Sequence, residues 1–374
     1  MMEVSVNLQH MEVETHVQSR AYRLLHPGDV REVILEHELL NGHVVVEPTI
    51  GSICHADLRY FTGQRRPEAL ASKLPMALIH EGIGRIVKSE AAGLEEGRRV
   101  VIVPSIPGYL SRGIGPADCC PICRSGQGDS YCLHGKFLGS GMDGIAQSRL
   151  PLPADCALPV PGEVPDEIAV LAELCSVSYQ AISRAAERIQ GTEARVAVFG
   201  DGPVGYLTAA MLHHCFGVER QRLQVFGAIP DKLAQFDFAQ TALVQQCDFA
   251  SFTPFDVVME CTGGRFSESA VNQAIDIAAP KGMLILMGVT EERVPMNTRD
   301  VLEKGLTVAG SSRSSAADFR QVLKVMSDPA CQHTLRKLLP EQAVPITCAA
   351  DFTAVMELAA AHRDWKKVLL DFRW

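Results

Sequence analysis

Hydrophobic residues in the second half of the chain gather in short runs that alternate with longer amphipathic stretches. Short apolar runs rich in β-branched and aromatic residues indicate buried strands, and their alternation with helical stretches indicates a parallel α/β sheet. This pattern predicts six parallel strands, which is the number in a full dinucleotide-binding sheet. The predicted strands are Val196–Phe199, Leu223–Phe226, Ala242–Gln245, Val257–Glu260, Leu284–Gly288 and Leu306–Ala309.

A glycine-rich turn directly follows the first of these strands. Residues 200–205 read Gly-Asp-Gly-Pro-Val-Gly, which fits G-x-G-x-x-G, and a helical run from Val204 to Cys215 follows. In such a turn the first glycine makes the bend, the second admits a pyrophosphate, and the third lets the helix pack on the strand. An ordinary turn uses the same residues, but the flanking strand and helix favour a cofactor site. We expect the dinucleotide to contact Gly200, Gly202, Pro203, Val204, Gly205 and, after the fourth strand, Gly263.

The first half of the chain carries short strand-like runs separated by turns. Residues 1 to about 17 show little pattern and are interpreted as partly an extension. The proline-rich stretch 150–165 predicts extended chain, after which Asp166 is expected to cap a helix from Glu167 to Ala172. A further helix, Val177–Ile189, leads to the glycine turn. The predicted strands are Val30–Leu35, His43–Pro48, Arg85–Ser89 and Arg98–Val103.

Composition narrows the class of protein. The 374 residues are 47% hydrophobic, which supports cores for two domains. A net charge of −9 without a basic run argues against a nucleic-acid partner. No apolar run approaches the roughly 18 residues that a membrane span needs, and the first residues lack the basic start and apolar core of a signal peptide. Twelve cysteines then indicate reduced thiols and metal ligands, so we expect a cytoplasmic protein with no membrane partner.

Cys54 and the pair His80-Glu81 lie on predicted loops between the short strands. Zinc takes thiolate, imidazole and carboxylate ligands, and a catalytic zinc site keeps one position open. Taken singly, Cys54 is more simply a buried thiol, and His80 a core or surface histidine. Together, upstream of a dinucleotide-binding fold, they predict a zinc-containing active site.

Cys54 with Asp57, then His80-Glu81-x-x-Gly84 and the downstream glycine turn, resemble the zinc-containing medium-chain dehydrogenases and reductases. The resemblance covers nearly the whole chain. It implies an α/β protein with a GroES-like, β-rich catalytic domain and a Rossmann domain built on a doubly wound parallel sheet. The implied domains are residues 1–175, to which the helical tail 318–374 returns, and residues 176–317.

The same resemblance implies the metal ligands. Cys54 and His80 bind the catalytic zinc, and Glu81 is a ligand or lies directly behind the metal. The stretch that begins at Ala172 is similar to the Glu-x-x-Ser-Val sequence of sorbitol dehydrogenase-like members, which implies Glu173 as a further ligand. Cys175 is the nearby competitor. A solvated helix charge is the plainer interpretation of Glu173, but its neighbours are apolar.

Four cysteines lie where many members of this family hold a structural zinc with the spacing C-x2-C-x2-C-x7-C: Cys119, Cys120, Cys123 and Cys132. This chain departs from that spacing. Ala117 stands where the first ligand is expected, and eight residues separate the last two cysteines. Adjacent cysteines seldom serve one ion easily. The sequence therefore leaves open a structural zinc or a set of free thiols.

The end of the second predicted strand bears on the choice between NAD and NADP. An NAD-selective fold places Asp or Glu there to hold the ribose hydroxyls. Here the position is Gly227, and Asp231, four residues later, is explained by a turn or cap. Without a carboxylate the repulsion against a 2′-phosphate is missing, and Lys232 can approach that phosphate. These observations favour NADP(H).

Longer motifs narrow the resemblance. The chain resembles the ribulose-5-phosphate reductases (ribitol-5-phosphate dehydrogenases) in the stretches SIC-x-ADLRYFTG, LPMALIHEG, GDGPVGY, ECTGG and NTRDVLEKGLTVAGSSRS. This likeness implies NADPH-dependent reduction of D-ribulose 5-phosphate to D-ribitol 5-phosphate, with zinc as Lewis acid. It also implies a supply of CDP-ribitol for cell-wall teichoic acid or capsular polymers. The alternatives are a dehydrogenase of another polyol or polyol phosphate, a non-catalytic NADPH sensor, and a redox or metal module based on the cysteines.

The resemblance leaves the proton donor open. Alcohol dehydrogenases carry Ser or Thr two residues after the cysteine ligand, and this chain carries Ala56. Protonation is then expected from a water at the metal held by Glu81 or Glu173, or from the hydroxyl of Tyr60.

The phosphate of the substrate requires cations, and the guanidinium fork suits phosphate. Arg59 and Arg313 are the expected ligands because they lie within the motifs, whereas at most one of the adjacent Arg65 and Arg66 is expected to point inward. Family likeness further implies a homodimer or homotetramer formed by edge pairing of Rossmann sheets. A pathway cytidylyltransferase is the implied protein partner.

Overall fold

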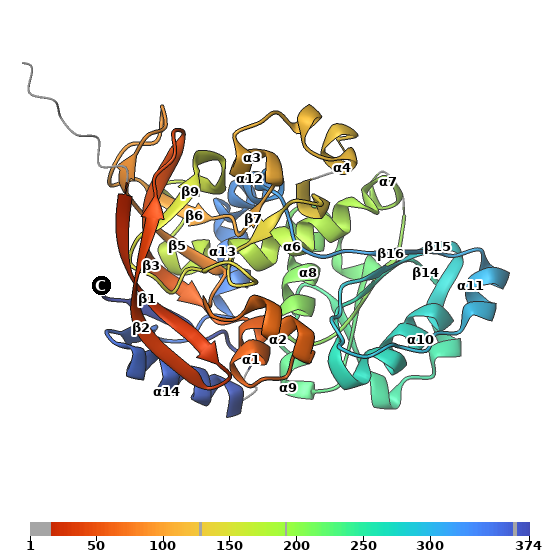
Figure 1. Cartoon of the computed structure of the whole chain (residues 1–374). Coiled ribbons are helices and arrows are strands. Elements are labelled where there is room, and N and C mark those ends of the chain that lie inside the picture. Colours follow the sequence, from red (N-terminus) through yellow and green to blue (C-terminus); the bar gives the residue numbers. More distant parts are fainter. Residues whose placement is uncertain (1–15, 127–128, 191–192, 362–364) are drawn as a thin grey trace, which may run out of the picture.

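The computed structural model describes residues 16–126, 129–190, 193–361 and 365–374. A β-rich part is built from the start and the end of the chain, and an α/β part from the middle (Figure 1). The predicted N-terminal extension lies almost wholly outside the described residues.

The α/β part contains a six-stranded sheet in which every neighbouring pair is parallel. Its order corresponds to 3-2-1-4-5-6 along the chain, which is the doubly wound order of dinucleotide-binding folds. The predicted strand number and the parallel arrangement are therefore confirmed. In sheet order the strands are β13 (Gln240–Leu243), β12 (Leu223–Gly227), β11 (Val196–Phe199), β14 (Phe255–Glu260), β15 (Ala278–Leu286) and β16 (Thr307–Gly310).

Helices cover both faces of this sheet because its strands are apolar on both sides. In β11, Val196 and Val198 belong to the hydrophobic cluster that includes α8 (Pro203–His214), whereas Ala197 and Phe199 belong to the cluster that includes α10 (Ser267–Ile277). Successive side chains of a strand point to opposite faces, so one short apolar run supplies two cores.

The β-rich part contains a seven-stranded sheet that the C-terminal tail completes. Strand β18 (Leu369–Phe372) pairs antiparallel with β3 (His43–Ser52) and parallel with β17 (Val344–Ile346). The remaining strands are β5 (Glu81–Ser89), β6 (Arg99–Ile102), β9 (Leu150–Pro153) and β10 (Ala157–Pro159), with a separate sheet of β1 (His16–His26), β2 (Asp29–Glu38) and β4 (Met76–Ala77), and a pair β7 (Ser105–Ile106) and β8 (Lys136–Phe137).

Helix α6 (Ala172–Ser183) connects the two parts. It packs against α8 and against α12 (Ala316–Met326), and the predicted domain boundary at residue 175 falls within it. The predicted single helix Val177–Ile189 is in fact α6 followed by α7 (Ala186–Ile189).

The helix expected at Glu167–Ala172 is shorter and is capped differently. Helix α5 runs from Asp166 to Ala169, and its N-cap is Pro165, so the prediction that Asp166 caps it was wrong. The Asp166 carboxylate instead forms an ion pair with Arg99. Asp166 therefore pairs with an arginine distant in the sequence and does not cap the backbone N–H groups of the helix.

The other helices are α1 (His55–Phe61), α2 (Pro67–Lys73), α3 (Gly108–Arg112), α4 (Pro121–Arg124), α9 (Pro230–Leu233), α11 (Thr298–Lys304), α13 (Pro329–Arg336) and α14 (Ala349–Ala361). Within the described residues, none of the helices combines the length and the apolarity that crossing a bilayer requires.

Candidate active site

Cys54, His80 and Glu81 form one cluster in the β-rich part. The cysteine sulfur, an imidazole nitrogen and a carboxylate oxygen all lie within 4.8 Å of one another. The backbone topology explains this, because β3 and β5 are antiparallel neighbours in which Ser52 pairs with Glu81. The residues just beyond the end of one strand therefore meet those at the start of the other.

Asp57 holds this cluster in place. Its buried carboxylate accepts hydrogen bonds from the backbone N–H of Cys54 at 2.9 Å and of Ile79 at 3.1 Å, and it lies 3.4 Å from Nδ1 of His80. Burial raises the pKa of Asp57, but His80 and these N–H groups outweigh it and the net pKa is lowered. A carboxylate on one ring nitrogen fixes the imidazole so that the other faces a metal. The sequence placed Asp57 in a motif but gave it no role.

The backbone before His80 is strained. Ile79 has φ +70°, a left-handed conformation that is an outlier for a β-branched residue. Its N–H is held by Asp57, and its carbonyl accepts the N–H of Ile145 at 2.7 Å. Such strain persists where the surroundings enforce it, and here it sits beside the residue that presents the imidazole.

Lys367 neutralises Glu81 from behind. The buried ammonium lies 2.9 Å from Oε2 of Glu81 and donates to the carbonyl of Ile53 at 2.8 Å. Lys367 comes from the C-terminal tail and carries no motif, so sequence reasoning missed it. Glu173 lies outside the 4.8 Å group. Burial raises the pKa of Glu173 to about 7; His80 opposes this shift and Glu81 adds to it, so Glu173 is an electrostatic neighbour of the cluster.

This donor set fits a catalytic zinc ion. Zinc bonds of about 2.0–2.3 Å place tetrahedral ligand atoms about 3.3–3.8 Å apart. The three donor atoms here lie within 4.8 Å of one another, which is compatible with that spacing. Thiolate, imidazole and carboxylate are zinc ligands, and three of them leave a position for substrate. The buried Asp57 and Lys367 supply the outer contacts that such ligands require.

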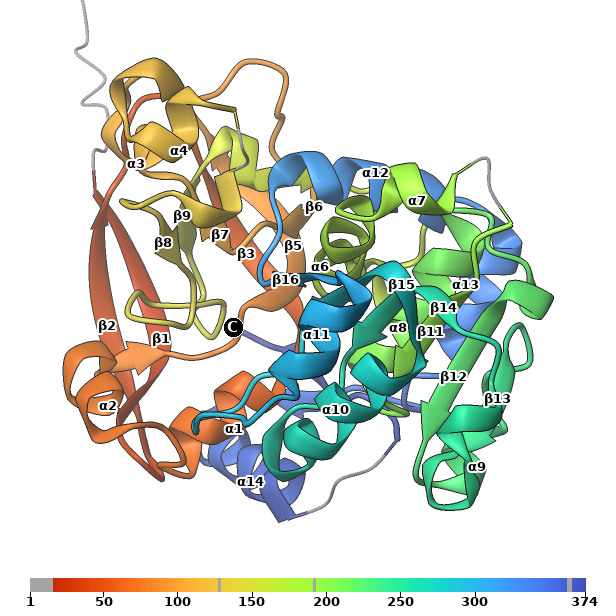
Figure 2. The ribbon, with the colours of Figure 1, turned by 90° about the vertical axis from the view of Figure 1, so that its right-hand side faces the viewer.

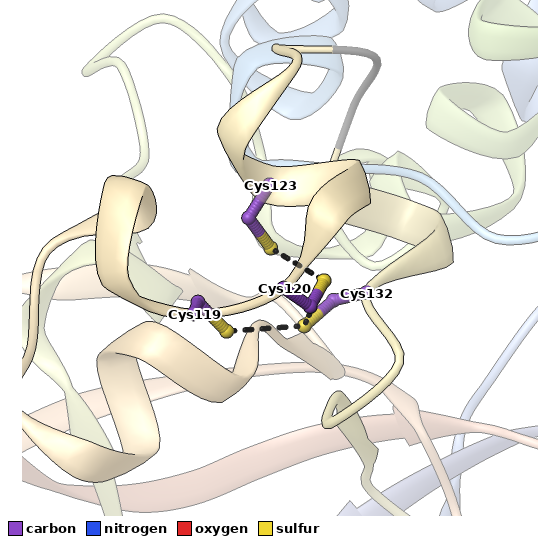
Figure 3. Close-up of side chains that lie close together, drawn as sticks. All are labelled: Cys119, Cys120, Cys123 and Cys132. Atoms are coloured by element: carbon purple, nitrogen blue, oxygen red, sulfur yellow. Dashed lines mark hydrogen bonds between the residues drawn. The ribbon is translucent and has the colours of Figure 1, made fainter.

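The second group of cysteines, Cys119, Cys120, Cys123 and Cys132, also converges, as Figure 3 shows. The segment that carries these four cysteines is called the lobe below. The sulfur of Cys119 lies 3.7 Å from that of Cys132, and the sulfur of Cys120 lies 3.5 Å from that of Cys123. A tetrahedral zinc with Zn–S bonds of about 2.3 Å requires sulfurs about 3.8 Å apart. Backbone N–H groups of Cys123 and Leu133 lower the pKa of Cys120 to about 6, which favours its thiolate, whereas burial raises the pKa of Cys119 and that of Cys123. The adjacency of Cys119 and Cys120 is therefore no obstacle in this fold.

The glycine turn has the geometry that the sequence predicted. Gly200 has φ +126°, and its N–H donates to the carbonyl of Phe226 at 2.9 Å. A Cβ on Gly205 would overlap the carbonyl of Gly200, so only glycine lets α8 begin this close to β11. A Cβ on Gly202 would meet no atom within 4 Å, which leaves its face open.

An acid does occupy the end of β12, although it comes from the glycine turn. Oδ2 of Asp201 accepts the N–H groups of Ala228 at 2.7 Å and Ile229 at 2.8 Å, and a Cβ on Gly227 would lie 2.8 Å from this oxygen. Position 227 itself carries no acid, but the inference that a carboxylate is missing there was wrong, because tertiary structure brings in that of Asp201. Lys232 lies in α9, directly after this turn.

Glu260 ties the turn after β14 to the turn after β15. Its buried carboxylate accepts the N–H groups of Thr262 at 2.7 Å, Gly263 at 3.3 Å and Gly288 at 3.2 Å. Burial raises the pKa of Glu260, and the three N–H groups oppose that shift. Gly263, with φ +66°, is thus held at the carboxyl edge of the sheet, where dinucleotides bind.

Three further predicted site residues, Tyr60, Arg313 and Arg59, make contacts outside the group of Cys54, His80 and Glu81. Tyr60 is buried, and its hydroxyl lies 3.1 Å from Oγ of Ser140. Arg313, in a left-handed conformation with φ +64°, places its guanidinium over the ring of Phe137, which packs against His80. Arg59 lies on α1 and forms an ion pair with Glu291.

Comparisons with known proteins agree with this geometry. The family model described as alcohol dehydrogenase GroES-like domain matches residues 40–162, and that described as zinc-binding dehydrogenase matches residues 236–328. The chain belongs to the zinc-binding dehydrogenase family. The predicted family and the α/β fold class are thereby confirmed.

Particular relatives cover almost the whole chain. Ribulose-5-phosphate reductase 1 of Staphylococcus aureus is 35% identical, with 94% of this chain and 98% of the relative covered. The ribulose-5-phosphate reductase of Bacillus spizizenii is 32% identical, with 95% and 99% covered. The crystal structure of S. aureus TarJ in complex with NADPH is 31% identical, covers 96% of this chain and 100% of that chain, and has a TM-score of 0.79.

Proposed function

We propose that this protein is a zinc- and NADPH-dependent reductase that converts D-ribulose 5-phosphate to D-ribitol 5-phosphate. The observation that carries the proposal is that ribulose-5-phosphate reductases match nearly the full chain, and that this chain keeps a zinc-compatible cluster of Cys54, His80 and Glu81. The cofactor assignment rests on the NADPH complex of a structural relative.

The direct test is NADPH oxidation with D-ribulose 5-phosphate, run beside NADH and beside unphosphorylated ribulose. Rapid turnover only with NADPH and the phosphorylated sugar supports the proposal. Turnover of an unphosphorylated polyol with NAD, in zinc-loaded protein, favours the second candidate, a dehydrogenase of the sorbitol or xylitol type.

We propose the following roles for the residues of the metal and cofactor sites. Cys54 and His80 would hold the zinc, Asp57 fixes the ring of His80, and Glu81, balanced by Lys367, is a third ligand or backs the metal. Glu173 is the proposed further ligand. A bound zinc supplies Lewis-acid polarisation of the substrate carbonyl. The turns around Gly200, Gly202, Pro203, Val204, Gly205 and Gly263, with Lys232, would hold the dinucleotide.

Tyr60 is the proposed proton donor. Its hydroxyl lies 3.1 Å from Oγ of Ser140, to which Nζ of Lys73 donates at 2.8 Å, so a hydrogen-bonded chain leads from Tyr60 to a partly exposed ammonium. We expect Tyr60→Phe to lower kcat about 10²-fold and to change its pH dependence, as loss of a positioned acid does. Unchanged turnover and an unchanged pH profile would assign the proton to a water held by Glu81 or Glu173 instead.

The edge of the six-stranded sheet supports the proposed homodimer. Strand β16 ends the sheet among the described residues, and it exposes Val308; Leu302 of the adjacent α11 is 78% exposed. Unprotected apolar edges pair with other strands. We expect Val308→Lys to shift the mass measured by light scattering from dimer or tetramer toward smaller species. Ile34→Lys, at a 61% exposed position on the separate β2, should leave the mass unchanged.

The product would be a sugar-alcohol phosphate, which a cytidylyltransferase can activate to CDP-ribitol for teichoic acid or capsular polymers. On this proposal the enzyme works in the cytoplasm, where NADPH is available. Depleting the protein in its own cells should lower the CDP-ribitol pool; an unchanged pool contradicts the proposed role.

A further inference from the structure

One carboxylate faces three guanidinium groups across the cleft between the two parts of the molecule. Glu291 lies on the loop between β15 and α11, and its oxygens are 3.0 Å from Nη1 of Arg65, 3.7 Å from Nη1 of Arg59 and 3.8 Å from Nε of Arg66. The arginines belong to α1 and to the segment that leads into α2. Figure 2 shows that loop extending from the α/β part toward these two helices.

The group formed by Glu291 and the three arginines carries a surplus of positive charge. Three guanidinium groups against one carboxylate leave two positive charges, and Arg59 and Glu291 line a cavity of about 440 Å³. The other charged groups that line it cancel in number: Arg265 and Arg293 against Glu268 and Glu292. A phosphate monoester carries about −1.5 to −2 charges near neutral pH, which matches this surplus.

The two inner arginines have unused donors. The side chains of Arg59 and Arg65 are only 21% and 18% exposed, and Nε of each is buried and lacks a hydrogen-bond partner among the described residues. A buried donor without a partner costs free energy, so a ligand that accepts from it is favoured. Arg66, with 73% of its side chain exposed, lies outside this pair.

The positions of the two guanidinium groups are set in advance. Arg65 lies 4.7 Å from the centre of the Tyr60 ring, which holds it by a cation–π contact. Burial and the neighbouring Arg65 lower the pKa of Arg59, and Glu291 opposes that shift. The two cations therefore repel each other in a partly dry site, and an anion between them removes the repulsion.

We propose that Arg59 and Arg65 form the subsite for the phosphate of the substrate, and that Glu291 is a built-in competitor that occupies this subsite when phosphate is absent. The inference rests on the proposed function in that the substrate carries a phosphate. It replaces Arg313 by Arg65 as the partner of Arg59.

The loop that carries Glu291 is also connected to the carboxyl edge of the six-stranded sheet, where the dinucleotide is expected to bind. Three residues before Glu291, Gly288 donates to Glu260, and Gly264 donates to the carbonyl of Val289 at 3.0 Å. Exchange of Glu291 for phosphate therefore acts on a loop whose base is fixed to the turns that carry Gly263. This arrangement lets a phosphate release the loop from the arginines without detaching its base.

The test is calorimetric titration of inorganic phosphate into the full-length protein at constant ionic strength, without substrate. Because the competitor is a partly exposed ion pair, Glu291→Gln is expected to tighten phosphate binding about three- to tenfold. Arg65→Lys, which loses the planar fork, should weaken it about tenfold or more. Glu303→Gln, the same charge change in an exposed ion pair with Arg299 on α11, is the matched control and should leave the affinity within about twofold of wild type.

Two outcomes overturn the proposal. Equal phosphate affinities for Glu291→Gln and Glu303→Gln would show that Glu291 does not compete with phosphate, and an unchanged affinity for Arg65→Lys would show that Arg65 does not bind it. Kinetics separate this failure from that of the proposed function. If ribulose 5-phosphate is reduced but the phosphate affinity is the same in all three variants, the proposed reaction is supported and the proposed phosphate subsite is refuted. If phosphate binding follows the prediction without turnover of that sugar, the subsite stands and the substrate is another phosphate.

Discussion

At the scale of single residues, the decisive contacts are made by carboxylates that bind backbone N–H groups. Asp57, Asp201 and Glu260 each collect two or three donors, and each lies at the base of the metal or cofactor site. A carboxylate held in this way fixes the backbone that presents the neighbouring functional group, because charge-assisted hydrogen bonds are the strong ones.

The first prediction concerns Asp57. Asp57→Asn keeps the shape of the side chain but turns an N–H₂ group toward groups that also donate, so His80 loses its orientation. We expect zinc affinity to fall about 10- to 100-fold, measured by competition with a chromogenic chelator. Asp318→Asn is the matched control, since Asp318 also accepts a backbone N–H, that of Ser315 at 2.8 Å, and is not part of the group of Cys54, His80 and Glu81. Equal zinc affinity in wild type and Asp57→Asn would refute the positioning role.

The second prediction concerns Asp201. Its carboxylate holds two N–H groups at the end of β12, where a 2′-phosphate also needs donors. Asp201→Asn removes the negative charge, so we expect the ratio of kcat/KM for NADPH over NADH to rise about three- to tenfold, as the loss of one nearby like charge allows. Asp231→Asn, an exposed acid on α9, should leave the ratio unchanged. A falling ratio would mean that Asp201 supports the phosphate.

At the scale of elements, the contact between β11 and α8 decides how the cofactor turn is built. Gly205 has no room for a Cβ, whereas Gly202 has open space. The two glycines therefore have different physical roles, one in packing and one in approach of the ligand, as the motif predicts.

The third prediction uses this pair. Gly205→Ala forces α8 away from the strand, and we expect it to lower the free energy of unfolding by about 1–3 kcal/mol and to weaken NADPH binding. Gly202→Ala should leave the melting temperature within about 2 °C of wild type and weaken NADPH binding through its methyl group alone. Calorimetry measures both quantities. If the two variants melt at the same temperature, the packing role of Gly205 is wrong.

At the scale of the whole molecule, the two cysteine-containing clusters are separate. Cys54 belongs to the strand ends that carry His80 and Glu81. Cys120, Cys123 and Cys132 form a small hydrophobic cluster of their own, against which Cys119, Tyr109 and Ile122 pack. The lobe therefore has little apolar core and depends on its sulfurs.

The fourth prediction is that the protein holds two zinc ions per chain. Cys123→Ser should leave about one zinc and lower the melting temperature, because a structural zinc contributes folding free energy. Cys54→Ser should also leave about one zinc but abolish reduction with a smaller change in melting temperature. Elemental analysis and thermal unfolding measure both. One zinc in wild type, unaffected by Cys123→Ser, would identify the lobe cysteines as free thiols.

The sequence by itself determined the features that depend on neighbours along the chain. The six strands follow from apolar runs and the turn at residues 200–205 from glycines at fixed offsets. The proposed ligands Cys54, His80 and Glu81 follow from short motifs, and the fold brings them together. Local sterics and hydrophobic burial set these features, and both are readable in a window of a few residues.

Tertiary structure alone decided which distant groups meet. Lys367 reaches Glu81 from the C-terminal tail, Asp201 fills the space beside Gly227, and Glu291 reaches Arg65 across the cleft. None of these contacts has a sequence signal, because each depends on strand order and on the way the two parts of the molecule pack. The proposed metal ligands could therefore be predicted from the sequence. The ammonium of Lys367 beside Glu81 and the carboxylate of Glu291 beside the arginines came only from the fold.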